Sequence, residues 1–482
     1  MLLDSMRAQL LPSSWSFESV FGSDCHTIVF DPTVFVFRAG RDITERLRAA
    51  VRLGRRLVVP RQSLLAARQM LYLFSESGNV NLRDRGRRAS ALFEQFLEFM
   101  RKLDDSSLVE ERGSVLSLLS DIMGAGSDSG VMLLTGNQLL AFIWQRYKRD
   151  PRAIVCNEDG SHLVSARTDE EMVRGTDRNR AIRWSRREGP LEVYYQDGRE
   201  VRCLALDEDS YLTERAEALI FSNPQDSGSL IKLFKRELSP ADISRMEEIS
   251  YWSTDDYAFP DHVYYLDDKL VVPCGYSMPR QGGAAALDAE VFLGVYGIPE
   301  VHNARQVGLG EILDLLIELL TKVKYIHMNG AIITDYNYGN FRFDMGETPY
   351  RRVKLIDVLG YVTNRDAGLY RANFALPEGV SFSRRTMLSC VREDLFFMQI
   401  AVFGILSTLL GGPGDAFNDY GRFFFGEGQN VTPAFKAAWG RMSPEVRGYF
   451  IRAFDGKTSK VPLFDDGDVL ISRLMDWRNS VG

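Results

Sequence analysis

Residues 1–148 show two hydrophobic patterns that alternate along the chain. Short runs of β-branched and aromatic residues are typical of buried strands, and longer segments with apolar residues every three or four positions are typical of amphipathic helices. Because strands that alternate with helices favour a mostly parallel sheet, this region is predicted to be an α/β domain. The expected strands are 26–37, 55–60 and 130–136, and the expected helices are 42–54, 89–103, 114–123 and 137–147.

The pattern changes after residue 148. Residues 149–190 are mainly polar and charged, so they are predicted to be a linker or an exposed insertion. Alternating apolar and polar positions around Asp197-Gly198 predict a hairpin over 191–206. The elements expected next are strands at 218–222 and 229–234, a helix at 239–252 that begins with the capping pair Ser239 and Asp242, and a hairpin at 263–279.

Most of the chain beyond residue 309 has helical periodicity. Residues 311–330 predict a long helix that ends at Gly330. The most apolar stretch, residues 396–412, is shorter than the roughly 20 residues that a membrane span requires. We therefore expect a buried core helix and no membrane segment. The N-terminus lacks a basic region followed by an apolar core, so no secretory signal is predicted and a cytoplasmic location is expected.

Composition is that of a folded globular protein. Of the 482 residues, 45% are hydrophobic and 26% are charged, with a formal net charge of −7. These values exclude a mostly disordered chain and a protein that is basic overall, and the length predicts about two to four domains. The five cysteines lie far apart, so buried thiols are expected rather than a disulfide framework or a zinc site.

Three polar side chains follow the long helix at characteristic spacing. Asp335 and Asn340 lie in the loop after it, and Asp357 follows a short hairpin. Phosphoryl transfer requires such a set. One carboxylate orients the attacking hydroxyl and accepts its proton, while an amide oxygen and a second carboxylate hold Mg²⁺ on the nucleotide phosphates. The spacing therefore indicates a phosphotransferase that uses ATP and Mg²⁺.

This arrangement resembles the catalytic core of protein kinases, in particular divergent bacterial ones. Asp335-x-x-x-x-Asn340 resembles the catalytic-loop aspartate and asparagine, and Asp357 with Gly360 resembles the metal-binding Asp-Phe-Gly. The other matching segments are LIKLF (230–234) at the strand of the phosphate-anchoring lysine, CGYSMP (274–279) at the hinge, ALPEG (375–379) at the end of the activation segment, and Asp394 before the apolar helix.

The resemblance implies an α+β bilobal kinase-like domain, with an N-lobe over 191–280 and a C-lobe over 281–482. The implied function is that of a Ser/Thr-type protein kinase acting on a protein substrate. The implied site consists of Asp335 as catalytic base, Lys232 with its partner Glu247 for ATP, and Asn340 with Asp357 for Mg²⁺.

Two of these assignments have rivals nearby in the sequence. Lys235 competes with Lys232, which is preferred because strand-like residues precede it. Glu248 competes with Glu247, because adjacent helix positions differ by about 100° and only one can face the lysine.

Several positions depart from the kinase pattern. Residues 211–221 contain no glycine where kinases have G-x-G-x-x-G, which would keep the backbone away from the phosphates. Ile333-Thr334 replace His-Arg, and Asn337 replaces the catalytic-loop lysine. The alternative function is therefore a pseudokinase scaffold that binds nucleotide or partner proteins without turnover. Small-molecule phosphotransferases share the Asp/Asn/Asp core, but Glu378 in the Pro-Glu segment favours the protein kinases.

The N-terminal unit resembles PIN-type nuclease domains. IVFDPTVFVF, LVVP and GVMLLTGNQLLA carry the resemblance and place Asp31 at the first acidic position. The resemblance implies an acidic cluster that holds Mg²⁺ or Mn²⁺ for RNA cleavage. Here the second acid has no counterpart in 61–70 and Asn137 replaces the last, with Asp121 and Asp128 as shifted substitutes. We therefore expect a PIN-like regulatory or targeting module rather than an active nuclease.

A basic run, RDRGRR (83–88), lies in the same unit. It is predicted to be a solvated loop and helix face, and an RNA contact through the N-terminal domain is the alternative interpretation.

Overall fold

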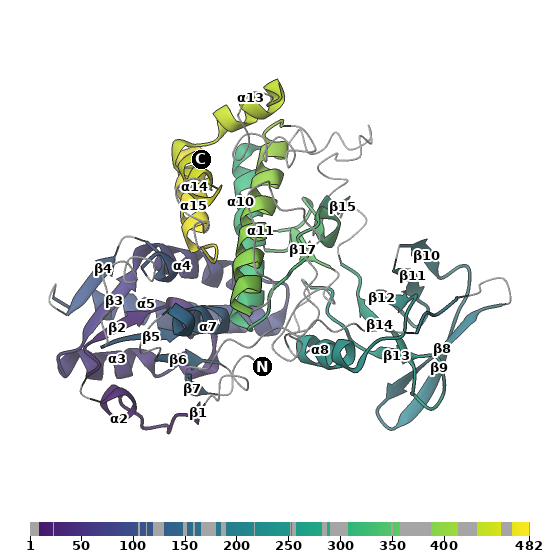
Figure 1. Cartoon of the computed structure of the whole chain (residues 1–482), viewed down its shortest axis with the longest axis horizontal. Coiled ribbons are helices and arrows are strands. Elements are labelled where there is room, and N and C mark those ends of the chain that lie inside the picture. The colour runs from purple at the N-terminus through teal and green to yellow at the C-terminus, as the bar shows by residue number, and fades with distance from the viewer. Residues whose placement is uncertain are drawn as a thin grey trace.

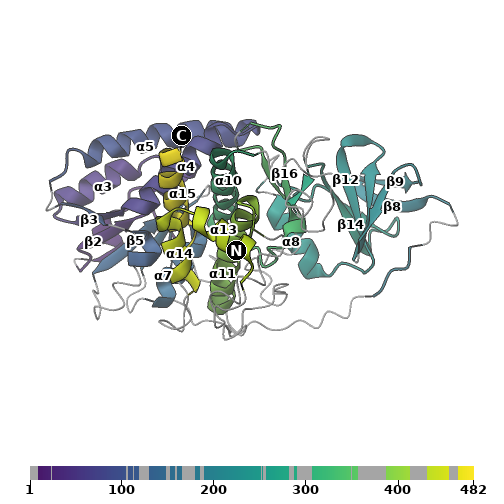
Figure 2. The ribbon, with the colours of Figure 1, turned by 90° about the horizontal axis from the view of Figure 1, so that it is seen from above.

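The computed structural model shows three bodies in a row: an α/β domain, a central group of helices and a β-rich lobe (Figures 1 and 2). The described residues are 9–22, 24–104, 107–111, 113–118, 130–147, 152–157, 160–164, 180–184, 189–215, 217–250, 252, 257–281, 287–289, 307–348, 350–356, 387–412, 431–454 and 465–481.

A sheet with helices packed around it forms the α/β domain. Its strands are β1 (Gln9–Leu10), β2 (Thr27–Phe30), β3 (Arg56–Pro60), β4 (Leu108–Glu111), β5 (Val131–Thr135), β6 (Ala153–Cys156) and β7 (Ser161–Val164). Its helices include α2 (Phe17–Phe21), α3 (Ile43–Arg52), α4 (Arg61–Ser75), α5 (Val80–Met100) and α7 (Gln138–Tyr147). The strand order is β1-β7-β6-β5-β2-β3-β4; the last five strands are parallel, β7 pairs antiparallel with β6, and β1 pairs antiparallel with β7. The predicted mostly parallel sheet is therefore present.

Two features of this domain differ from the sequence prediction. The sheet continues beyond residue 148, because β6 pairs with β5 and β7 pairs with β6. Part of the segment 149–190, expected as a linker, therefore belongs to the sheet. The strand expected over 26–37 ends at Phe30, because Pro32 has no N–H for a ladder and the Asp31 carboxylate caps a 3₁₀ helix, η1 (Pro32–Val36).

Helix α5 also begins earlier than expected. The Asn79 side chain accepts a hydrogen bond from the Leu82 N–H at 2.9 Å and caps the helix there. The basic run 83–88 is therefore entirely helical, with no loop portion.

The β-rich lobe contains an antiparallel sheet and one helix. Its strands are β8 (Leu191–Asp197), β9 (Glu200–Leu206), β10 (Tyr211–Glu214), β11 (Ala218–Asn223), β12 (Asp226–Phe234), β13 (Val263–Tyr265) and β14 (Pro273–Pro279). The strand order is β10-β11-β12-β14-β13-β8-β9, and helix α8 (Pro240–Ser250) connects β12 to β13. The predicted Ser239–Asp242 capping box is confirmed. The β8–β9 hairpin extends the sheet beyond β13, and it carries Cys203, which is exposed although a buried thiol was expected.

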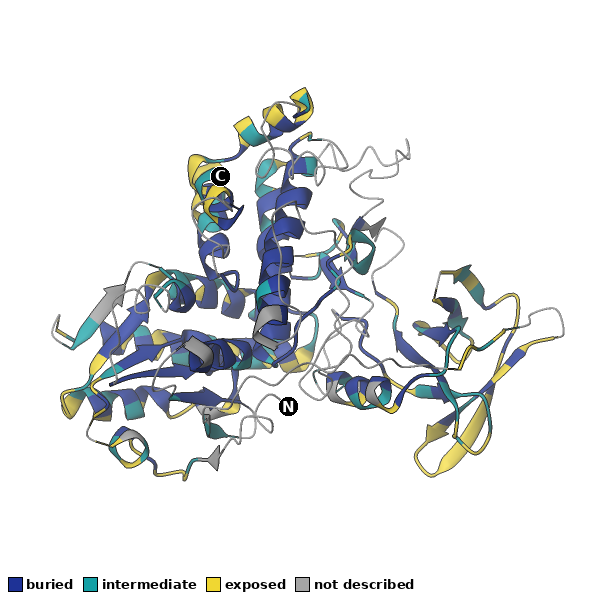
Figure 3. Ribbon diagram, in the orientation of Figure 1, coloured by how far each residue is buried: buried dark blue, intermediate teal, exposed yellow. Residues whose placement is uncertain are grey.

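The central body consists mainly of helices. These include α10 (Leu309–Met328), α11 (Met387–Leu409), α13 (Pro433–Arg441), α14 (Pro444–Phe454) and α15 (Asp468–Val481). A small sheet of order β15-β16-β17 contains β15 (Leu287–Asp288), β16 (Phe341–Phe343) and β17 (Val353–Leu355). Helices α10 and α11 lie side by side and are almost entirely buried (Figure 3), so the apolar stretch 396–412 contributes to a core helix as predicted.

The α/β domain packs directly on the central helices. Helix α15 contacts both α10 and α4 (Figure 1). The Phe74 ring on α4 lies 5.5 Å from the ring of Tyr325 on α10 and 5.5 Å from that of Tyr350. One continuous apolar cluster therefore includes both cores, whereas the β-rich lobe has clusters of its own.

This shared core predicts a large effect of one substitution. Phe74→Ala removes a fully buried ring from the boundary between the two bodies. We expect urea denaturation to give a free energy of unfolding lower by about 3–5 kcal/mol. The control Tyr72→Ala removes a ring that is 54% exposed on the same helix and should change stability by about 0.5 kcal/mol or less. Equal effects of the two variants would contradict the shared core.

Candidate functional site

The loop that follows α10 brings together two of the predicted catalytic residues. Gly330, at φ 80°, ends the helix turn, and the chain then runs to the 3₁₀ helix η4 (Tyr338–Asn340). The Asn340 side-chain N–H donates to the Asp335 carbonyl oxygen at 3.3 Å. The Ile356 N–H donates to the Asn340 carbonyl oxygen at 2.9 Å. The loop is therefore closed on itself and tied to the residue that directly precedes Asp357.

The buried carboxylate of Asp394 anchors this loop to α11. Asp394 on α11 accepts hydrogen bonds from the Thr334 N–H at 2.7 Å and from the Tyr336 hydroxyl at 3.0 Å. Thr334 has φ 57°, a conformation that costs a non-glycine residue roughly 1–3 kcal/mol. Because the charged acceptor binds the Thr334 N–H in this conformation, Asp394 stabilises the strained backbone next to Asp335. The sequence-based link between Asp394 and the catalytic loop is thus confirmed.

Sequence reasoning missed the role of His327. Its side chain, at the end of α10, is completely buried, and its Nε2 lies 2.9 Å from Asp394 Oδ2. An ionisable residue among the apolar positions at the end of α10 was the available signal.

A second polar anchor on α10 was also missed. The Glu318 carboxylate accepts hydrogen bonds from the Tyr350 N–H at 2.9 Å and the Val353 N–H at 2.8 Å. Lys322 lies 3.0 Å from Glu318 and donates to the Val353 carbonyl oxygen. This buried pair fixes the start of β17, the strand that leads to Asp357.

Lys232 lies on β12 of the β-rich lobe. It is 9% exposed, and its Nζ lies 5.1 Å from the centre of the Phe234 ring. Phe234 belongs to an apolar cluster against which Ile356 packs. The described contacts therefore connect the strand of Lys232 to the residue before Asp357.

Glu247, the proposed partner of Lys232, lies at an exposed position of α8. Glu247 is exposed, whereas Met246 and Ile249 are buried. The negative charge of Glu247 adds to the effect of burial in raising the pKa of Tyr265 on β13. This exposed position does not support the ion pair with Lys232, which stays a prediction, and the Glu248 side chain lies outside the described residues.

Lys235, the rival of Lys232, has a different task. Its Nζ lies 2.7 Å from Glu214 and donates to the Arg215 carbonyl oxygen at 2.9 Å. These contacts brace the short connection between β10 and β11, where protein kinases have their glycine-rich loop.

Asp357 and the segment 375–379 lie outside the described residues, as do Asp121 and Asp128. Their assignments stay predictions.

Asp31, at the acidic position of the α/β domain, is hydrogen-bonded to two threonines of the same domain. Asp31 is 1% exposed, and its Oδ2 accepts hydrogen bonds from the hydroxyls of Thr33 and Thr135, each at 2.5 Å. Asn137 caps α7 through its amide oxygen, and its amide nitrogen donates to Asp466 before α15 at 3.3 Å. Within the described residues, no group of three or more His, Cys, Asp or Glu side chains is arranged to hold a metal ion.

Charged groups from the central helices meet this edge of the sheet. The Lys324 ammonium on α10 lies 3.0 Å from Asp466 and donates to Asp468. Burial alone would lower the pKa of Lys324, but the charges of Asp466, Asp468 and Asp31 together raise it above its ordinary value. Burial raises the pKa of Asp31 and of Asp468, and the positive charge of Lys324 opposes both shifts.

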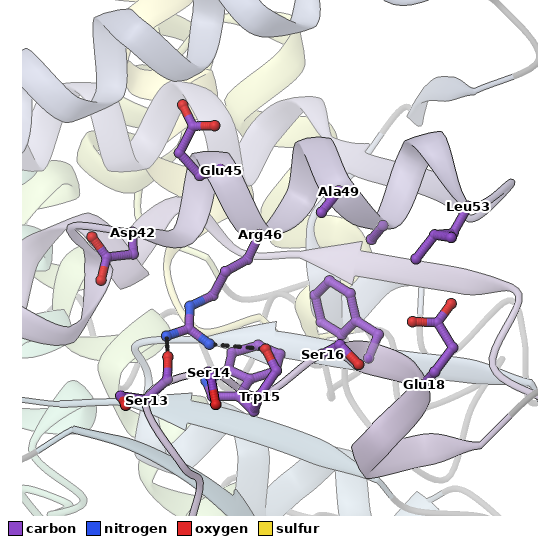
Figure 4. Close-up of a pocket in the computed structure, with 12 residues that line it drawn as sticks. Ser13, Ser14, Trp15, Ser16, Glu18, Asp42, Glu45, Arg46, Ala49 and Leu53 are labelled. Atoms are coloured by element: carbon purple, nitrogen blue, oxygen red, sulfur yellow. Dashed lines mark hydrogen bonds between the residues drawn. The ribbon is translucent and has the colours of Figure 1, made fainter.

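A groove of about 320 Å³ lies elsewhere on the α/β domain, between the N-terminal segment and α3 (Figure 4). Arg46 crosses it, donating to the Ser13 and Trp15 carbonyl oxygens. None of the predicted catalytic residues lines this groove. Among the helices that the structure describes, none combines the length and apolar character needed to span a membrane.

Comparisons with known proteins give limited support. No protein-family model matches the sequence, and no curated protein matches it. Among solved structures, the chain is similar to the ROP18 kinase domain in complex with AMP-PNP and sucrose, with 16% identity, 61% of this chain and 84% of that chain covered, and a TM-score of 0.38. It is also similar to ROP2 from Toxoplasma gondii, described as a virulence factor with a protein-kinase fold and no enzymatic activity, with 12% identity, 61% and 85% coverage, and a TM-score of 0.39.

The carboxyl groups before α15 predict a pH dependence of stability. Burial and the charge of Asp466 raise the pKa of Asp465 to about 6. A raised carboxyl pKa means that the folded state binds more protons than the unfolded state between about pH 4 and 6. The contribution of Asp465 to stability should therefore fall by roughly 1 kcal/mol per pH unit as the pH rises through this range.

Urea denaturation at several pH values checks this expectation. Asp465→Asn should remove that part of the slope, whereas Asp476→Asn, at an exposed position on α15, should keep the wild-type slope. A wild-type slope in Asp465→Asn would contradict the assignment.

Proposed function

We propose that residues 191–481 form a protein kinase-like module that transfers the terminal phosphoryl group of ATP to a hydroxyl of a protein substrate. The observation that carries the proposal is the closed loop of Asp335 and Asn340, anchored on Asp394. Such a loop holds a carboxylate and an amide in fixed relative positions, which phosphoryl transfer requires more than it requires covalent chemistry.

The roles of the residues follow from their positions. Asp335 would orient the acceptor hydroxyl and take its proton. Lys232, on a strand of the facing lobe, would bind the phosphates. The amide nitrogen of Asn340 is engaged by the Asp335 carbonyl oxygen, so the amide oxygen is the atom that would face a cation. This oxygen and the Asp357 carboxylate fit Mg²⁺, which prefers hard oxygen ligands and would neutralise phosphate charge.

The braced β10–β11 turn favours a second function. Without a glycine-rich loop, fewer backbone N–H groups could cover the phosphates, and the module would be a pseudokinase that binds nucleotide or a partner protein without turnover. In either function, the α/β domain would be a PIN-like regulatory or targeting module.

Phosphate incorporation from radiolabelled ATP tests the first function. With the purified chain and a generic protein acceptor, Asp335→Asn should lower the rate roughly 100- to 10,000-fold, because it removes the proton acceptor. The exposed residue Asp476 on α15 gives the matched control Asp476→Asn, the same substitution far from this loop in the sequence, which should keep most of the activity. Equal incorporation by wild type and Asp335→Asn would remove the proposal.

ATP binding separates the two lysines and the two functions. Lys232→Met should abolish the increase in melting temperature that ATP and Mg²⁺ produce. Lys235→Met and the exposed control Lys269→Met should retain it. Binding without phosphate incorporation would favour the pseudokinase, and loss of binding in Lys235→Met alone would reverse the assignment of the two lysines.

A further inference from the structure

The boundary between the α/β domain and the central helices contains a buried set of charges. Lys324 is 1% exposed and lies among Asp31 at the end of β2 and Asp466 and Asp468 at the start of α15. Asn137, from the end of β5, donates to the same Asp466 oxygen that Lys324 contacts. The set therefore joins the edge of the parallel sheet to two helices of the central body.

Charge balance requires the ammonium. Removing carboxylates from water is costly unless a cation compensates them. Two buried carboxylates, those of Asp466 and Asp468, contact one ammonium here, so loss of Lys324 would leave their negative charges buried together.

The helix that carries Lys324 also ends at the predicted catalytic loop. His327 lies about one turn further along α10 and contacts Asp394, which in turn accepts the Thr334 N–H. Residues that fix the position of α10 therefore act on the same helix that sets the position of the loop.

We propose that Lys324 is a positioning residue: its ammonium is a built-in cation for the buried carboxylates of Asp466 and Asp468, and because Asp466 also accepts from Asn137 of the α/β domain, this bridge clamps α10 and holds the loop 331–340 in place. The α/β domain then supports the kinase-like module from within the same chain. The inference rests on the proposed function only where it regards 331–340 as the catalytic loop.

Hydrogen exchange and urea denaturation of the full chain test the proposal, and neither needs phosphoryl transfer. Lys324→Met should raise the unfolding equilibrium constant at least a hundredfold and accelerate amide exchange in 331–340 at least tenfold, relative to amides of the β8–β9 hairpin. Arg478→Met is the matched control, because it removes a half-exposed ion pair of 3.0 Å between the same two helices, and both quantities should stay within about fivefold of wild type.

Rescue distinguishes charge from packing. In the Lys324→Met background, Asp468→Asn removes one of the buried carboxylates that have lost their cation. It should lower the unfolding equilibrium constant of that variant at least tenfold. If Asp468→Asn does not lower the unfolding constant of Lys324→Met, the proposal that Lys324 neutralises buried carboxylates is wrong. If the amides of 331–340 exchange at the wild-type rate in Lys324→Met, the proposed positioning role is wrong.

A second variant applies if Lys324→Met does not fold. Asn137→Asp keeps the oxygen that caps α7 but places a carboxylate against Asp466, so it should accelerate exchange in 331–340 at least tenfold. Asn79→Asp is the matched control, because it changes another helix cap of the same domain away from the cluster. Equal exchange in the two asparagine variants would overturn the proposal. If the wild-type chain incorporates no phosphate while these exchange and denaturation results are obtained, only the proposed function is wrong and the positioning role stands.

Discussion

One buried carboxylate, Asp394, determines the geometry of the candidate site. It accepts hydrogen bonds from the backbone of Thr334 and the hydroxyl of Tyr336 in the loop, and it contacts the His327 ring at the end of α10. A buried carboxylate without donors would be unstable, so the loop, α10 and α11 must meet at one point. The left-handed backbone at Thr334 persists because this contact opposes its conformational cost.

Helix α10 organises the central body through polar side chains on an otherwise apolar surface. Glu318 and Lys322 fix the hairpin that leads toward Asp357. Lys324 contacts Asp466 and Asp468 at the start of α15, and His327 contacts Asp394. Apolar packing stabilises the contact between helices but is not directional, whereas each charged or hydrogen-bonded contact requires a particular partner at a particular distance. The polar residues on α10 therefore determine the relative register of the bodies that pack on it.

Local features of the site could be predicted from the sequence, because they depend on neighbouring residues. Each of these features is formed by residues that are close in the sequence: the Asp335–Asn340 pair, the Ser239–Asp242 cap and the hairpin at 191–206. Contacts between distant segments could not be predicted in this way. His327 and Asp394 are 67 positions apart, and no local pattern indicates that they meet. The Glu247 assignment relied on helix phase alone, which cannot identify the face that a neighbouring strand covers.

The charged cluster around Lys324 also has a consequence for biosynthesis. Lys324 precedes Asp466 by 142 positions, and Asn137 precedes it by 329. At about 5–20 residues per second, a ribosome needs roughly 7–28 s to translate the 142 positions from Lys324 to Asp466. During that interval α10 has no carboxylate from α15 beside its lysine. The α/β sheet can therefore assemble early on the nascent chain, while the central helices reach their final arrangement only after the last of these segments has emerged.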